Sequence, residues 1–551
     1  SSPNLDENKP DHRLALFLPS TPQFVAENKE QAIEPFKIAG GMSLQLDATL
    51  AIEPGTAIAV LRDWIRERDG ILHRGGLPKP NPSARSFQEE LDLCRTGFLK
   101  TMWNEQVHGW SHCIGWAPSI DAPGFCSLLW MDSQLSTNIA GRAESKARVE
   151  FAVEQMLKQN GPGIFLSQNK CHIMQWEFPF LYGYLPEALE KFDGQIRPII
   201  ASQLTNGGWT IQLGDKPNEK ALGQEGDSVL GTCALRAQIL MRYARITGDR
   251  EVQAAGERAL AFMESFRVPR GAQSWECPVY EPDILAAGYA VRAYDEAYRA
   301  TGNYRWLQDA VYWAETGVPF IYLWSLPDRP MMLGATLPVF GSTFYTHSWL
   351  AMPVQWNGLV YSYAVSHLAD DLKTNVLSKT NSSLPIQLDL TPEEWKRIVE
   401  LITVSGEYQQ FPDGDKAGAY PDSISDFKIR NQPFLNPEDI LVNLLALEGQ
   451  DPDIKTARID HAIVSSGATI DELKETSSGV RFGLRFFAGQ NSHSFMAGFR
   501  PTEIVVNGKK LPESGTPIKR EPGWWWDRVH RRAYFTVPHD RAQANIEIKQ
   551  Q

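Results

Sequence analysis

The chain has 551 residues and a net charge of −12, and 42% of its residues are hydrophobic while 22% are charged. This balance is typical of globular proteins and excludes a fibrous or disordered chain, and the length predicts two or three structural units. No apolar run approaches the ~20 residues that a membrane helix needs, and no long stripe of Lys and Arg is present to bind phosphates. We therefore expect neither a membrane nor a nucleic-acid partner.

The six cysteines are scattered, without a CxxC pair or the spacing of zinc ligands. Such cysteines are more often buried small hydrophobic residues than a disulfide framework. No GxGxxG, P-loop, HExxH or GxSxG motif is found, so we expect no cofactor and no metal. The sequence begins at Ser1 rather than Met, which favours a processed, secreted or periplasmic protein. The oligomeric state stays open.

Three regions follow one another along the chain. Residues 1–85 read as a β-rich lead-in and linker, with strands at Leu14–Leu18 and Met42–Ala51 and a short helix from Thr56 to Glu67. Residues 86–450 are predominantly helical. Residues 451–551 return to strands, with a hairpin turn at Asn507-Gly508, and predict a β-sandwich.

A weak internal repeat marks the helical region. The pairs Thr247-Gly248 and Thr301-Gly302 each follow a predicted helix, and they lie 54 residues apart. A period of this size fits one helical hairpin with a loop. About 365 helical residues then hold between six and seven hairpins, and six close an (α/α)6 toroid. An open α-solenoid has a similar period and is the alternative.

The helices of a hairpin differ in side-chain size. The predicted helices from Asp227 to Arg245 and from Asp283 to Ala300 are rich in Ala and Gly, whereas the helices between them carry Phe262, Trp306 or Trp313. Small side chains let helices approach closely. The sequence therefore predicts an inner ring of small-residue helices and an outer ring of bulkier ones.

Loop lengths indicate which end of this toroid carries a site. The turns from inner to outer helices are short, whereas the connections back, at about 267–282, 318–355 and 406–437, are long. The long connections share one end and are rich in aromatic residues that can stack on sugar rings. With an upstream segment, they supply the candidate substrate-binding residues His172, Trp176, Trp275, Glu276, Tyr280, Tyr345, Trp349 and Trp356.

Acidic residues recur where the inner helices should begin. The candidate catalytic carboxylates are Asp227, Glu281 and Asp283, with Glu177 and Glu225 in reserve. Asp is also a favoured helix N-cap, so capping is the competing interpretation, and Asn436-Pro-Glu438-Asp439 reads almost entirely as a cap. Glycoside hydrolysis needs two carboxyl groups, one protonated and one ionised.

A different chemistry is suggested by His347 in the longest loop. A polysaccharide lyase abstracts a proton next to a uronate carboxylate with Tyr or His, and Tyr345, His347, Tyr280, His172 and Arg270 could supply such roles. Further along, Asp413-Gly-Asp415 with the nearby Asp422 and Asp426 resembles a calcium loop, but a solvated loop is the simpler interpretation.

Together the small-residue helices, the Thr-Gly turns, the aromatic loops and the terminal strands resemble the (α/α)6-toroid glycoside hydrolases and polysaccharide lyases. The resemblance implies a mainly α fold, an (α/α)6 toroid with a β-sandwich, and a carbohydrate substrate. Lyases of this shape often carry an Asn-His pair, and Thr346-His347 stands here instead.

Our leading hypothesis is a glycoside hydrolase that acts on a polysaccharide or its oligosaccharides. A lyase is the first alternative, and a glycan-binding toroid without catalysis is the second. A terpene cyclase is disfavoured, because the chain has no DxDD motif.

Overall fold

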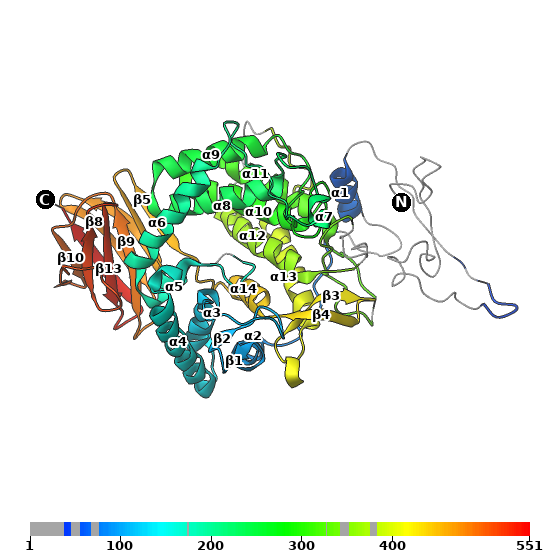
Figure 1. Cartoon of the computed structure of the whole chain (residues 1–551), viewed down its shortest axis with the longest axis horizontal. Helices are drawn as coiled ribbons and strands as arrows, with labels where there is room; N and C mark the ends of the chain where they lie inside the picture. The colour runs from blue at the N-terminus through cyan, green and yellow to red at the C-terminus, as the bar shows by residue number, and fades with distance from the viewer. Residues whose placement is uncertain are drawn as a thin grey trace.

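The computed structural model describes residues 38–43, 45, 56–67, 76–173, 176–326, 328–341, 352–374 and 383–550. The strand predicted at Leu14–Leu18 and most of the one predicted at Met42–Ala51 lie outside the described residues. The predicted short helix is present as α1 (Ala57–Glu67). Beyond it, the helices run from Phe87 to Leu447 and the last ten strands from Lys455 to Lys549 (Figure 1).

The helical part alternates between two rings. The inner helices are α3 (Pro123–Leu135), α5 (Phe178–Tyr182), α8 (Leu230–Thr247), α10 (Ile284–Thr301), α12 (Gln355–Thr374) and α14 (Glu438–Leu447). The outer helices are α2 (Phe87–Thr96), α4 (Ile139–Gln159), α6 (Leu185–Ala201), α9 (Arg250–Met263), α11 (Tyr304–Gly317) and α13 (Pro392–Gln409). A further short helix, α7 (Pro217–Lys220), lies in the connection before α8.

Contacts between the inner helices form a closed ring. α8 packs on α10, α10 on α12, α12 on α14, α14 on α3, and α3 on α5. An ion pair between Arg242 of α8 and Glu177 at the start of α5 links the remaining neighbours. The return of the last helix to the first excludes an open solenoid and confirms the predicted (α/α)6 toroid.

The Thr-Gly turns close their hairpins as the sequence predicts. Gly248 and Gly302 have φ values of 73° and 70° and cap α8 and α10 in the left-handed conformation. The residues after them, Asp249 and Asn303, accept hydrogen bonds from the first backbone amides of α9 and α11. One glycine thus ends a helix and the next side chain starts another, because their conformational preferences suit those two positions.

Small side chains on the inner helices permit close approach, as expected. A Cβ atom at Gly288 of α10 would lie 2.9 Å from the Cα atom of Tyr361 of α12. Ala286, Ala287 and Ala290 on the same helix are completely buried. Large residues at these positions would push the two inner helices apart.

Two antiparallel five-stranded sheets complete the chain. One has the order β11-β10-β14-β8-β7 and the other β12-β13-β9-β6-β5. The strands are β5 (Lys455–Ile459), β6 (Ala462–Ser466), β7 (Thr469–Thr476), β8 (Gly479–Arg485), β9 (Asn491–Ala497), β10 (Glu503–Val506), β11 (Lys509–Lys510), β12 (Gly523–Asp527), β13 (Arg532–Pro538) and β14 (Gln543–Lys549). Phe482 of the first sheet packs against Phe535 of the second at 6.3 Å, as in the predicted β-sandwich.

Two short hairpins inside the helical region were not predicted. They are β1 (Trp103–Asn104) with β2 (Gly109–Trp110), and β3 (Tyr420–Ser425) with β4 (Ile429–Leu435). Both precede inner helices, α3 and α14, and therefore lie at the end of the toroid where the inner helices begin. We call this end the mouth, and we call the end where the inner helices finish the far end.

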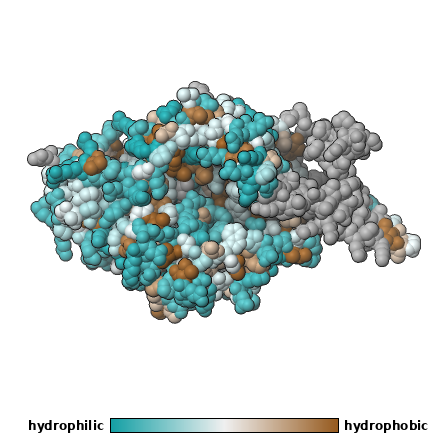
Figure 2. Space-filling view, in the orientation of Figure 1, coloured by the Kyte–Doolittle hydropathy of each residue, from teal (hydrophilic) through white to brown (hydrophobic). Residues whose placement is uncertain are grey.

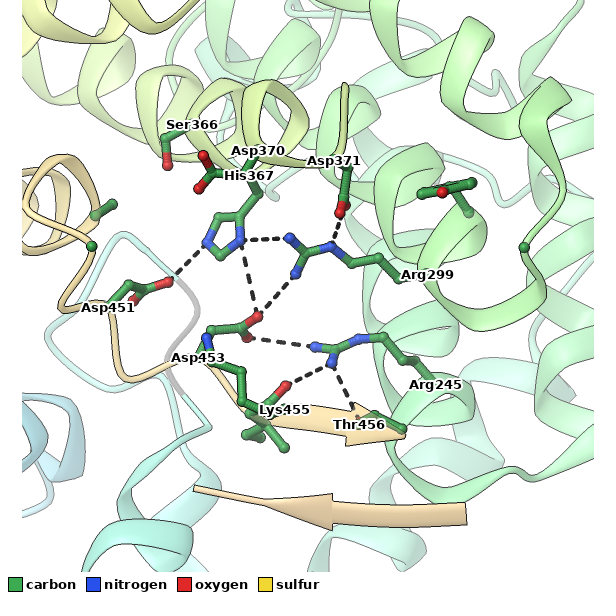
Figure 3. A pocket seen from close by; sticks show the side chains of 15 residues that line it. Arg245, Arg299, Ser366, His367, Asp370, Asp371, Asp451, Asp453, Lys455 and Thr456 are labelled. Atoms are coloured by element: carbon green, nitrogen blue, oxygen red, sulfur yellow. Dashed lines mark hydrogen bonds and ion pairs between the residues drawn. The ribbon is translucent and has the colours of Figure 1, made fainter. Parts of the chain in front are cut away.

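The far end is closed by charged side chains. Asp453, in the segment between α14 and β5, forms ion pairs with Arg242, Arg245 and Arg292 at 3.3–3.6 Å and with Arg299 at 2.9 Å. These arginines hold the pKa of the Asp453 carboxyl well below its usual range, against the effect of burial. Figure 3 shows Asp453 between Arg299 and Arg245, beside a cavity of about 530 Å³.

All six cysteines are buried and unpaired, which confirms their predicted role as small hydrophobic residues. Of the helices that the structure describes, none combines the length and apolar character needed to cross a bilayer. In the view of Figure 2, hydrophilic residues cover most of the described face and hydrophobic ones form small separate groups.

Replacing the acid that closes the far end tests its contribution to stability. We expect Asp453→Asn to lower the free energy of unfolding by about 3–5 kcal/mol, because it leaves buried arginines without their counter-charge. Denaturant unfolding measures the loss. Asp370→Asn, at an exposed position on the same cavity, is the control and should stay within about 0.5 kcal/mol of wild type. Equal stability of the two variants would contradict this role.

Candidate active site

The three long connections that the sequence places at one end lead into α10, α12 and α14, so their described parts lie at the mouth. The segments that precede the inner helices are residues 102–122, 160–177, 202–229, 264–283, 318–354 and 410–437. The turns at the far end are short, except for the one between α12 and α13. Several exposed aromatic side chains gather on the mouth segments: Trp116, Trp275, Tyr280, Trp324 and Phe340.

A hydrogen-bonded cluster around Asp439 occupies the centre of the mouth. Asp439, in the first turn of α14, accepts hydrogen bonds from the Tyr420 hydroxyl and, at 2.8 Å, from Nδ1 of His172. The adjacent Glu438 accepts the backbone amides of His172 and Ile173 at 3.1 and 3.3 Å. Because carboxylate oxygens accept, Nδ1 of His172 carries a proton, and in the neutral tautomer Nε2 keeps a lone pair.

These two acids do more than cap a helix. Asn436 accepts the Glu438 amide at 3.0 Å and so takes a capping role, which agrees with the prediction for this motif. The Glu438 and Asp439 carboxylates instead reach across the mouth to the loop that carries His172. Acidic residues in the first turn of a helix are expected from the helix dipole alone. The sequence therefore predicts only the cap and not the contact of Glu438 and Asp439 with the His172 loop.

Five aromatic rings follow one another across the mouth. Trp116 lies 6.0 Å from His112, His112 lies 4.6 Å from His172, and His172 stacks on Trp356 at 4.2 Å. Trp356 in turn stacks on Trp275 at 6.1 Å. We call these five residues the ring row. The side chains at the two ends of the row are accessible to solvent, since Trp116 is 54% exposed and Trp275 is 49% exposed. Trp356, inside the row, is only 8% exposed.

A carboxyl with a strongly raised pKa lies at one end of the ring row. Glu276 follows Trp275 directly and is partly buried. Burial, followed by the negative charge of Asp422 from β3, raises the pKa of the Glu276 carboxyl to about 7. Both effects favour the protonated form of Glu276, since burial and a nearby negative charge each disfavour a second anion.

The other predicted carboxylates lie elsewhere at the mouth or below it. Asp227 accepts a hydrogen bond from the Tyr280 hydroxyl, and Glu225 is exposed in the same loop. Glu281 is partly buried, with its carboxylate beside Gly341. The structure thus brings Asp227 and Tyr280 together.

Asp283 and Glu177 are buried. Asp283 is the N-cap of α10, where it accepts the amides of Ala286 and Ala272, and burial raises its pKa to about 7. Glu177 pairs with Arg242, and burial outweighs that arginine to raise its pKa to about 7. Both side chains are only 2% exposed, so a substrate in the mouth cannot reach them without rearrangement.

Among the predicted substrate-binding residues, His172, Trp275 and Trp356 join the ring row. Trp176 instead packs under the guanidinium of Arg242, and it is 4% exposed. Tyr345, His347 and Trp349 lie outside the described residues. Five further residues at the mouth were not predicted as site residues: His112, Trp116, Tyr420, Asp422 and Asp439. Of these, only Trp116 and the two acids are of residue types that the sequence pattern marks as candidates.

The axis of the toroid below the ring row is packed. A cavity of only about 20 Å³, room for about one water molecule, lies between His172 and the buried Arg292. A molecule at the mouth therefore cannot pass along the axis at this level.

One group in the described structure has the composition of a metal site. Ligand atoms of His172, Glu438 and Asp439 lie within 4.8 Å of one another. Nδ1 of His172 bonds Asp439 and Glu438 accepts two amides, whereas the buried Oδ1 of Asp439 has no hydrogen-bond partner among the described residues. The arrangement works as a hydrogen-bond cluster.

No protein-family model and no curated protein matches the chain. Among solved structures, it is similar to an unsaturated glucuronyl hydrolase from Bacillus sp., which is described as responsible for the degradation of glycosaminoglycan. The identity is 12% and the TM-score is 0.40, and the match covers 66% of this chain and 95% of the other. It is also similar to an inactive variant of an α-1,6-mannanase of Salegentibacter sp. in complex with α-1,6-mannotriose (11% identity, TM-score 0.37, 66% and 98% of the two chains). A cellobiose 2-epimerase from Bacillus thermoamylovorans matches with 12% identity and a TM-score of 0.40 over 65% of this chain and 99% of the other.

The raised pKa of Glu276 predicts a pH-dependent cost to stability. The folded protein holds this proton up to about pH 7, whereas the unfolded chain releases it near its ordinary pKa of ~4.3. As pH rises through this window the unfolded chain gains the free energy of ionisation while the folded protein keeps the proton, so stability falls, by at most about 4 kcal/mol. Glu276→Gln removes this cost, so its stability relative to wild type should rise from pH 5 to pH 8.

Thermal unfolding across this pH range measures the difference. Glu144→Gln, at an exposed position on α4, is the matched control and should follow wild type at every pH. A Glu276→Gln curve that also stays parallel to wild type would show that the Glu276 carboxyl has an ordinary pKa.

Proposed function

We propose that the protein is a carbohydrate-active enzyme, and specifically a glycoside hydrolase whose site is the mouth of the toroid. The observation that carries this proposal is the Glu276–Asp422 pair at the end of the ring row. It supplies one carboxyl whose pKa is raised to about 7, a neighbouring acid, and, in Trp275, an exposed ring that fits the C–H face of a sugar.

The chemistry follows from these protonation states. Glu276 donates its proton to the glycosidic oxygen as the bond from that oxygen to the anomeric carbon breaks. Water adds to the anomeric carbon, and Asp422 accepts the proton that the water loses. Asp227 and Glu281 lie in neighbouring mouth segments, where they can bind sugar hydroxyls.

A polysaccharide lyase is the second candidate, and the His172–Asp439 pair favours it. Asp439 holds Nδ1–H of His172, which leaves Nε2 able to take a proton next to a uronate carboxylate. Tyr420 is poorly suited to that role, because it is completely buried, its hydroxyl bonds Asp439, and burial raises its pKa well above the usual range. This asymmetry supports hydrolysis over elimination.

Amide substitutions of the two acids separate these candidates. We expect Glu276→Gln and Asp422→Asn each to lower kcat/KM by roughly 10²–10⁴, the range for loss of a general acid or base. A panel of polysaccharides is assayed for new reducing ends and for ultraviolet-absorbing unsaturated products. Asp415→Asn, at an exposed position before β3, is the control and should retain full activity.

Reducing ends without ultraviolet absorbance, lost in both acid variants, are the expected result. An ultraviolet-absorbing product that survives in Glu276→Gln but is lost in His172→Ala would replace the hydrolase with the lyase. Binding of a glycan, seen as a thermal shift without any product, would establish a binding protein instead.

A further inference from the structure

The ring row extends well beyond the two acids. Glu276 and Trp275 lie at one end, and Trp116 lies at the other, past Trp356, His172 and His112. A single sugar stacked on the exposed Trp275 would leave the Trp116 end of the row empty. Scattered exposed aromatic residues are ordinary on protein surfaces, but a continuous row with both ends exposed is not.

The turn that presents Trp116 is firmly held. Gly115 has a φ of 81°, and the Trp116 amide donates to the Cys113 carbonyl at 3.0 Å, which makes a tight β-turn that favours glycine at this position. The Trp116 carbonyl accepts the Ser111 hydroxyl at 2.8 Å. The Trp116 backbone is therefore positioned before any ligand binds, which lowers the entropic cost of binding.

The neighbouring loop fixes the middle of the row in the same way. The Lys170 carbonyl bonds Nδ1 of His112 at 3.1 Å, and Lys170 Nζ donates to the carbonyl of Ala117 at 3.2 Å. Asn436 donates to the His112 carbonyl at 3.1 Å. Three mouth segments that are distant in sequence thus hold His112 and Trp116 in line with His172.

We propose that the substrate is an extended glycan chain, which lies along the ring row with its cleaved bond near Glu276 and its longer arm reaching Trp116. This inference rests on the proposed function, and it adds a binding subsite at Trp116 and a preference for chain length. Affinity for a glycan should accordingly increase with its length until the chain covers Trp116.

Calorimetric titration of the full-length Glu276→Gln protein measures binding without cleavage. The probes are cello-, xylo- and manno-oligosaccharides, from disaccharides to hexasaccharides. For a series that binds, we expect the hexasaccharide to bind more tightly than the disaccharide. Adding Trp116→Ala should weaken hexasaccharide binding roughly tenfold, the effect of losing one apolar stacking contact, and leave disaccharide binding unchanged.

The control is Tyr304→Ala, which removes a 42% exposed aromatic residue from the far end of the toroid and should change neither affinity. Equal affinity for short and long chains, or equal binding by the Trp116→Ala and Tyr304→Ala proteins, would overturn the Trp116 subsite and leave the proposed hydrolase intact. If no probe binds and the wild-type protein cleaves no polysaccharide, the proposed function falls together with this inference.

Discussion

Four arginines of α8 and α10 meet at the far end of the toroid, where Glu296 and Asp453 lie among them and Glu177 and Asp371 pair with Arg242 and Arg299. Nη2 of Arg292 lies 2.8 Å from Glu296, which also pairs with Arg245. All of these groups except the partly buried Arg299 and Asp371 are almost fully buried, so an uncompensated charge among them would be costly. Asp453 comes from the segment that follows the last inner helix. Docking of that segment therefore completes the ring, closes its far end and fixes the start of the β-sandwich.

Closure of one end leaves the mouth as the entrance, and the two ends have opposite electrostatics. At the far end, arginines lower the pKa of the Glu296 carboxyl to about 2 despite its burial. At the mouth, burial and the charge of Asp422 raise the pKa of Glu276 to about 7. The same residue type thus has a pKa of about 2 at one end and of about 7 at the other. Salt bridges that stabilise the fold are kept away from the groups that we assign to catalysis.

Much of the fold could be predicted because its signals are local. Thr-Gly turns, small inner-helix residues and unequal loop lengths each reflect a constraint within one hairpin. The site was less accessible, because it depends on contacts between distant segments. The sequence predicts Asp422 to be part of a solvated loop. Its charge acts on Glu276 because Asp422 lies on β3 of the β3–β4 hairpin at the mouth. Asp439 reads as a cap, and Asp283 reads as a catalytic acid although its carboxylate is committed to capping α10. Local sequence cannot separate these cases, since capping and catalysis use the same residue in the same turn.

The proposed hydrolysis depends on Glu276, because the enzyme becomes inactive when this carboxyl loses its proton near neutral pH. The most direct test is the pH dependence of kcat/KM for a glycan that the wild-type protein cleaves. We predict a fall in kcat/KM as pH rises through about 7, where the folded Glu276 ionises. A profile that stays flat from pH 6 to pH 8 would contradict the assignment of Glu276 as the general acid.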